Sequence, residues 1–125
     1  MEHKPRFTTL FPLEKRQAES ARIIQKYPDR MPIIVEPCEM NSSTPVIQKT
    51  KYLVPKNFTV AELLKVIRKQ IPALTAEEAL FVCVIMPDKT IEMPPITENI
   101  STIYATAKHE DGFMYFNYTK QVTFG

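Results

Sequence analysis

KYLVPKNFTVAELLKVIRKQI, residues 51–71, is the stretch that decides the fold of this chain. Its first residues end a strand predicted over Val46 to Val54, and Pro55 closes that strand. Thr59 and Glu62 then form a capping box, which is typical of a helix start. Apolar residues recur behind it at helical spacing, so we predict an amphipathic helix from Thr59 to Ile71. Its apolar stripe is Val60, Leu63, Leu64, Ile67 and Ile71.

The residues before this stretch predict a helix and a strand. Leu13 to Lys26 indicates a mostly polar helix with a thin apolar stripe, and Pro28 stops it. Such a helix is expected to pack on the outside of a domain. Met31 to Val35 is rich in β-branched residues and predicts a strand, and Glu36 to Pro45 then predicts a loop.

The residues after it predict two strands separated by a short helix. Thr75 with Glu78 forms a second, shorter capping box. Leu80 to Met86 is wholly apolar and predicts a central strand buried on both faces. Apolar positions between Ile96 and Ala107 predict a short amphipathic helix, and the aromatic-rich segment from Phe113 to Tyr118 predicts the last strand.

The predicted order is helix, strand, strand, helix, strand, helix, strand. This order matches an α+β protein with a ubiquitin-like β-grasp fold, to which the polar first helix is an addition. We therefore expect an N-terminal helical extension over residues 1–27. A ubiquitin-like domain with a flexible C-terminal tail is expected over residues 28–125.

The composition is that of one ordinary globular domain. The chain has 125 residues, of which 44% are hydrophobic and 24% charged. Its formal net charge of +2 is too small to indicate nucleic-acid binding. The sequence contains no apolar run of the roughly 18 to 20 residues that span a bilayer, and residues 1–10 lack an apolar signal-peptide core. The default expectation is a cytosolic or nuclear protein whose membrane contact comes from a modification or a surface patch.

Several segments together resemble the autophagy-related protein eight family, which includes GABARAP and the microtubule-associated light-chain-three proteins. YPDRMPIIVEP at residues 27–37 resembles a family motif, and KTKYLVPKNFTVAELLKVIRKQI at residues 49–71 resembles a family strand and helix. ALFVCV at 79–84 and EDGFMYFNYTKQVTFG at 110–125 resemble the buried strand and the C-terminus. FPLEKRQAE at 11–19 resembles the start of the N-terminal helices. The match covers nearly the whole chain in the right order.

The resemblance implies a ubiquitin-like modifier that is joined through Gly125 to phosphatidylethanolamine on growing autophagosome membranes. Activating and conjugating enzymes would carry the carboxyl group through an adenylate and a cysteine thioester, and a cysteine protease would process and deconjugate it. Glycine suits this passage through narrow active sites because it has no Cβ. Gln121 to Phe124 are then expected to form a mobile tail. The protein would be cytoplasmic, and membrane-bound when lipidated.

Other possibilities remain open at this stage. The chain could be a ubiquitin-like interaction module that is never conjugated, or a protein-to-protein modifier like ubiquitin. Gly125 could be exposed by a protease or encoded as the last residue.

The resemblance also implies binding of cargo receptors and adaptors that carry an aromatic-x-x-aliphatic motif, as an added strand at a sheet edge near residues 49–54. An aromatic set would receive the first motif residue: Glu19, Ile23, Pro32, Ile34, Lys51, Leu53 and Phe113. An aliphatic set would receive the last: Tyr52, Val54, Pro55, Phe58, Leu63, Val66 and Ile67, with Arg68 at its rim. Arg30, Lys49 and Lys51 would meet acidic residues that flank the motif. Ile34, Leu63 and Ile67 could equally be plain core residues.

We expect no catalytic, metal or cofactor site. Cys83 lies in an apolar run and is expected to be an inert buried thiol, and Cys38 lies in a polar loop. His3 and His109 form no metal-ligand pattern with either cysteine. The basic residues in and just after the first helix could form a weak basic face toward anionic lipid or tubulin, although a solvated helix surface is the more usual explanation: Lys15, Arg16, Arg22, Lys26 and Arg30.

Overall fold

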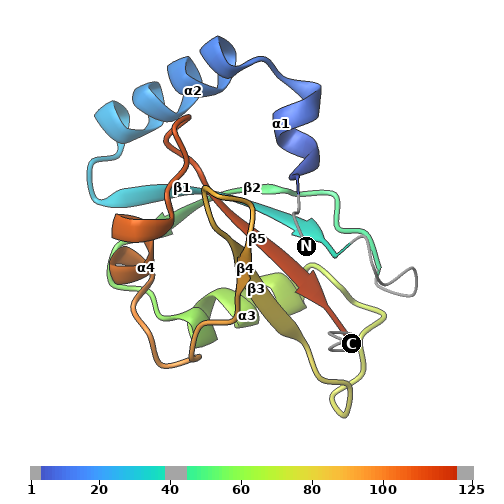
Figure 1. Ribbon diagram of the computed structural model, residues 1–125. Coiled ribbons are helices and arrows are strands. Elements are labelled where there is room, and N and C mark those ends of the chain that lie inside the picture. Colours follow the sequence, from blue (N-terminus) through green and yellow to red (C-terminus); the bar gives the residue numbers. More distant parts are fainter. Residues whose placement is uncertain (1–3, 39–44, 121–125) are drawn as a thin grey trace.

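The computed structural model describes residues 4–38 and 45–120 (Figure 1). Its elements in chain order are α1 Arg6–Leu10, α2 Leu13–Lys26, β1 Arg30–Pro37, β2 Lys51–Pro55, α3 Val60–Lys69, β3 Phe81–Ile85, β4 Ile91–Glu92, α4 Ile100–Ala107 and β5 Met114–Thr119. The helix predicted from Leu13 to Lys26 has those bounds.

The strands form one mixed sheet in the order β2-β1-β5-β3-β4. β1 and β5 run parallel at its centre, while β2 pairs with β1, and β3 with both β4 and β5, in antiparallel fashion. This is the topology of a β-grasp, so the α+β, ubiquitin-like prediction is confirmed. β2 lies at one edge of the sheet, as expected for the segment that contains KYLV.

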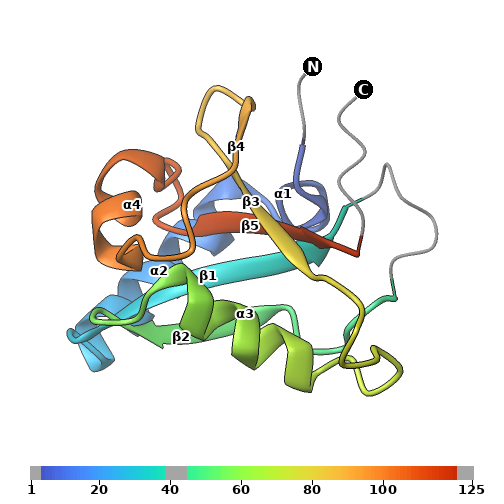
Figure 2. The same cartoon turned by 90° about the horizontal axis from the view of Figure 1, so that it is seen from below.

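Helices cover both faces of the sheet (Figures 1 and 2). On one face a first core joins α3 and α4 to the strands and includes Ile33, Leu63 and Ile67. On the other face a smaller second core joins Phe7 of α1 to Ile34, Ile85, Phe113 and Tyr115, with Ile23 of α2 packed against it. The side chains of β1 alternate between the two cores, which explains why the run MPIIV is apolar throughout.

Pro32 lies in β1 although proline is disfavoured in central strands. It faces Leu53 of β2, and the neighbouring register pairs show why it is tolerated. Main-chain bonds join Val35 N–H to Thr50 O at 2.7 Å and Lys56 N–H to Asp29 O at 3.1 Å. Antiparallel pairs alternate between bonded and non-bonded, so Pro32 and Leu53 form a non-bonded pair. Pairing of β1 with β5 begins one residue later, at Ile33, and no partner strand needs the missing N–H.

Some predicted boundaries were wrong. The strand predicted over Val46 to Val54 is only Lys51–Pro55, and Pro55 belongs to it, which an edge strand permits. α3 ends at Lys69 rather than Ile71 because Pro72 disfavours helical backbone in the residue before it. α4 begins at Ile100, and Ile96 lies exposed before it.

Three local features differ from the predictions. The second capping box has only one of its bonds, from Thr75 N–H to Glu78 Oε1 at 2.9 Å, and β3 begins too soon afterwards for a helix. α1 was not predicted, since a single turn has no periodic pattern. The Glu36 carboxylate from β1 satisfies its first N–H groups, Arg6 and Phe7, at 3.0 Å each. The two-residue strand β4 was also missed.

Thr59 caps α3 as predicted, with both bonds of the capping box present. We expect Thr59→Ala to lower the free energy of unfolding by about 1 kcal/mol, because a first-turn N–H loses its acceptor. Asn99 is the matched control, since it is the N-cap of α4 and makes no side-chain cap bond. Urea denaturation measures both variants, and equal losses in Thr59→Ala and Asn99→Ala would contradict the capping role.

Candidate functional site

The edge strand β2 offers main-chain groups for another strand. Tyr52 and Val54 occupy the bonded register positions opposite β1, as the flanking bonds at Thr50 and Lys56 establish. The N–H and C=O groups of Lys51 and Leu53 therefore point away from the sheet. An extended peptide could pair with them.

The side chains of β2 divide between the two faces of the sheet. Tyr52 and Val54 are buried in the first core, toward α3. Lys51 and Leu53 point the other way, and Lys51 forms an ion pair with Glu19 of α2. The period of two along a strand thus separates the predicted aromatic set from the predicted aliphatic set.

The structure brings the members of the aromatic set together. Pro32 and Ile34 of β1 lie beside Leu53 and Lys51 in register, and Ile23 packs on the cluster that holds Ile34 and Phe113. Pro32, Ile34 and Phe113 are buried. Glu19, Ile23, Lys51 and Leu53 are partly exposed and are the members that a ligand can reach.

Phe7 belongs to the same neighbourhood and was missed by the sequence analysis. Its ring centroid lies 5.2 Å from that of Phe113 in an edge-on contact. The Lys51 ammonium lies 5.9 Å from the centroid of the Phe7 ring. One phenylalanine in a short polar segment carries no periodic signal, so the sequence alone offered nothing to find it by.

Members of the aliphatic set other than Pro55 belong to the first core, between β2 and α3, at different depths. Tyr52, Val54, Leu63 and Ile67 are buried in the first core, whereas Pro55, Phe58 and Val66 are half-buried. Burial also raises the pKa of Tyr52 to about 12. Leu63, Ile67 and, on the other face, Ile34 are fully covered, which favours the core alternative for these three.

The basic residues near the edge already have partners within the protein. The Arg30 guanidinium donates to Leu53 O at 3.1 Å, on the free side of β2. The Lys49 ammonium lies 5.1 Å from the centre of the Tyr52 ring. Arg68 instead turns toward the loop after α3 and donates to Thr75 O at 3.2 Å and Glu78 O at 2.8 Å. A ligand would therefore compete with these contacts at Arg30 and Lys51.

Comparison with known proteins identifies the family. A sequence model described as "Autophagy protein Atg8 ubiquitin like" matches residues 15–125. The chain belongs to the Atg8 family. It is therefore an autophagy protein with a ubiquitin-like fold.

Individual Atg8 proteins are similar to this chain over most of their length. Autophagy-related protein 8d of Arabidopsis thaliana is 50% identical over 114 residues, which are 91% of this chain and 89% of that protein. Autophagy-related protein 8 of Candida albicans is 47% identical over 122 residues, 98% of this chain and 85% of that protein. The crystal structure of Trypanosoma brucei ATG8 matches with a TM-score of 0.83 and 35% identity, covering 98% of this chain and 100% of that one.

The cysteines of this Atg8-family protein lie away from the β2 edge. Cys83 is buried, and burial raises the pKa of its thiol to about 11. The thiol therefore stays protonated, and its burial agrees with the prediction; that it is inert remains a prediction. Cys38 is partly exposed, and its N–H donates to Tyr118 O at 2.9 Å. Within residues 4–38 and 45–120, no three His, Cys, Asp or Glu residues are grouped so as to hold a metal ion.

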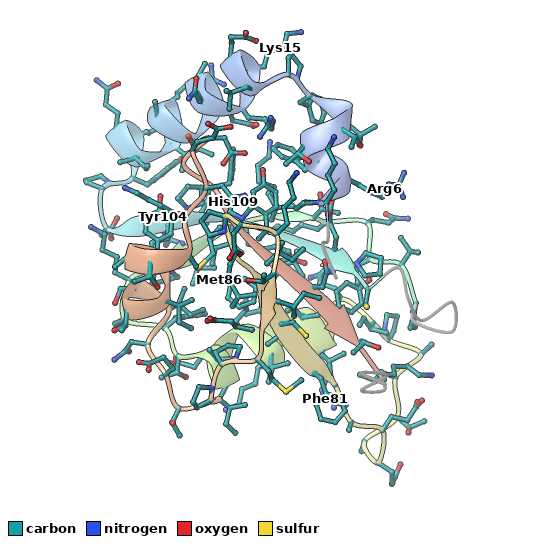
Figure 3. All side chains as sticks on the ribbon, in the orientation of Figure 1. Arg6, Lys15, Phe81, Met86, Tyr104 and His109 are labelled. Atoms are coloured by element: carbon teal, nitrogen blue, oxygen red, sulfur yellow. The ribbon has the colours of Figure 1, made fainter. Side chains whose placement is uncertain are left out.

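The basic face of α2 is smaller than predicted. Lys15, Arg22 and Lys26 are exposed, and Figure 3 shows Lys15 on the side of α2 away from the sheet. Arg16 does not belong to this surface, because its guanidinium bonds to buried Asp111 at 2.6 Å. The sequence could not reveal this pair, since its partners are 95 residues apart.

Two predictions at the C-terminus concern residues outside the described part of the chain. These are the attachment residue Gly125 and the tail from Gln121 to Phe124, and His3 likewise lies outside it. Across the residues that the structure does describe, no helix is both long and apolar enough to cross a bilayer.

Proposed function

We propose that this Atg8-family protein is a ubiquitin-like modifier, joined through Gly125 to phosphatidylethanolamine on autophagosomal membranes. There it recruits cargo receptors and adaptors that carry aromatic-x-x-aliphatic motifs. The protein is not itself an enzyme. Dedicated activating and conjugating enzymes attach it, and a cysteine protease processes and releases it.

Family membership supports the conjugation half of this proposal, because the family match extends through Gly125. A carboxylate is a poor electrophile, so ATP-dependent enzymes must activate it and pass it on through a thioester. The lipid then supplies membrane affinity through its acyl chains. Each buried CH₂ of an acyl chain contributes about 0.8 kcal/mol, and two chains together anchor a protein stably.

The single observation that carries the peptide-binding half is the division of side chains along β2. An added strand would pair with the outward main-chain groups of Lys51 and Leu53. Its residues would alternate in direction as β2 does, so that one enters the aromatic set and another the aliphatic set. Acidic residues beside the motif would pair with Lys51 in place of Glu19 and would also interact with Arg30 and Lys49.

We expect Lys51→Ala combined with Leu53→Ala to weaken binding of an aromatic-x-x-aliphatic peptide at least tenfold, or about 1.4 kcal/mol. The thermal unfolding midpoint should change little, because both side chains are partly exposed. Isothermal titration calorimetry measures the affinity. Lys65→Ala on the exposed side of α3 is the matched control and should bind like the wild type. Unchanged affinity in the doubly substituted protein would refute the assignment of the aromatic set.

A further inference from the structure

Most polar contacts of helix α2 are made with the loop before β5, while Glu19 also pairs with Lys51 of β2 and Ile23 packs on the second core. Ser20 is its only buried residue, and most of its other side chains are exposed. Apolar burial therefore does little to fix this helix. Its Ser20 hydroxyl donates to the main-chain O of Asp111, and Gln17 Nε2 donates to Glu110 O at 3.2 Å. In Figure 1 the loop between α4 and β5 reaches up to α2, where these bonds form.

The Asp111 carboxylate is the centre of this attachment. It is 1% exposed and accepts bonds from Arg16 of α2 at 2.6 Å, from the Tyr115 hydroxyl and from Phe113 N–H at 2.8 Å. Burial, followed by the Asp111 bond, raises the pKa of Tyr115, so its hydroxyl remains a donor. A buried carboxylate with an Arg partner and two further donors is strongly oriented. We call Arg16, Ser20, Asp111 and Tyr115 the α2 clasp.

Gly112 permits the close approach that the clasp requires. Its φ of +88° is in the left-handed region that favours glycine. A Cβ at this position would also overlap the Ser20 hydroxyl. The loop therefore meets α2 at a distance that only glycine allows, which indicates a defined docking position rather than a loose surface contact.

The clasp lies one helical turn from the proposed peptide site. Glu19 follows Arg16 by three positions, and Ile23 follows Ser20 by three, so each pair lies on one side of α2. Glu19 and Ile23 are the two residues that α2 contributes to the aromatic set. The rest of that set comes from β1, β2 and Phe113, just before β5. Two of these members also have a bond to α2 or to the clasp, since Lys51 pairs with Glu19 and Phe113 N–H donates to Asp111.

We propose that Asp111 is a positioning residue for recognition of the aromatic motif side chain. It acts through Arg16 and Ser20 by setting the distance of α2 from β2, and it touches no peptide itself. The inference rests on the proposed peptide-binding function. The aliphatic set, apart from Pro55, belongs to the core on the other face of the sheet and is independent of the clasp.

The test uses two peptides that differ only in having the aromatic motif residue or alanine. Wild-type protein should prefer the aromatic peptide at least tenfold by calorimetry. Asp111→Asn keeps the shape but leaves the Arg16 charge without its counter-ion. We expect this variant to lose the aromatic preference while its affinity for the alanine peptide stays unchanged.

Three further variants separate positioning from general instability. Glu110→Gln, an exposed neighbour in the same loop, should keep the full preference. Arg16→Met combined with Asp111→Asn removes both charges of the pair and should restore part of the aromatic preference. Amide hydrogen exchange of Ile33 and Val35 should remain slow in every variant, which shows that the sheet is intact. If Asp111→Asn does not fold, Ser20→Ala carries the same test, because it removes the bond to the Asp111 carbonyl and otherwise only a bond to Gln17 O within α2.

The possible outcomes separate failure of the positioning role from failure of aromatic recognition itself. A full aromatic preference in folded Asp111→Asn overturns the positioning role, as does an equal loss of affinity for both peptides. If the wild type itself binds both peptides equally, the proposed recognition of the aromatic motif residue fails, and the clasp proposal fails with it.

Discussion

Gly125→Ala should abolish attachment of this protein to phosphatidylethanolamine. The carboxyl group must pass through an adenylate and a thioester in active sites shaped for a residue without a Cβ. A methyl group at that point obstructs every later step, so we expect complete loss of the product rather than a slower reaction. The assay mixes the protein with Atg8 activating and conjugating enzymes, ATP and phosphatidylethanolamine liposomes. A shift in gel mobility reports the adduct.

Gln121→Ala is the matched control for this experiment and should form the adduct as the wild type does. Mass spectrometry of the product distinguishes a lipid adduct from attachment to a lysine side chain. A lysine adduct would make the chain a protein-to-protein modifier. Absence of any adduct from wild-type protein, with enzymes that conjugate another Atg8 protein, would leave only a peptide-binding domain.

Leu63→Ala should lower the free energy of unfolding by about 2–5 kcal/mol. Leu63 is 0% exposed and lies where α3 packs on the sheet, so truncation leaves a cavity within the first core. Urea denaturation with a linear extrapolation measures the change. A loss of this size would place Leu63 among the residues that hold the fold together.

Leu64→Ala is the matched control, because the same substitution one position along removes a side chain that is only partly buried against that core. Leu64→Ala should lower the free energy of unfolding by less than half as much as Leu63→Ala does. The opposite pattern, with Leu63→Ala stable but unable to bind the motif peptide, would make Leu63 a pocket residue and contradict the core assignment.

The elements were largely predictable because their signals are local. Thr59 and Glu62 define the start of α3 through two bonds within one turn, and both bonds are present. The apolar run behind them gives the helix its buried stripe. In the same way the apolar segment from Leu80 to Met86 contains β3. Together with the motifs that match the Atg8 family, these patterns predict the β-grasp from the sequence alone.

Failures occurred where short segments depend on distant partners. α1 is stabilised by Glu36 from β1, and the turn at Thr75 is held by Arg68 and by Glu78. Glu78 in turn pairs with Lys120 at 2.7 Å, and this hydrogen bond lowers the pKa of Glu78 to about 2. No periodic pattern predicts such contacts, and those of Glu36 with α1 and of Glu78 with Lys120 join residues that are remote in the chain.

The sequence by itself determined the type and order of the long elements, the family and the residues to be considered for binding. Capping bonds and apolar periodicity act within a few residues, so they can be read along the chain. Only the tertiary structure decided which side chains of β2 face α2 and which face α3, and that Arg16 meets Asp111 beneath the helix. Those arrangements depend on strand pairing and on contacts between remote residues, which exist only once the sheet has formed.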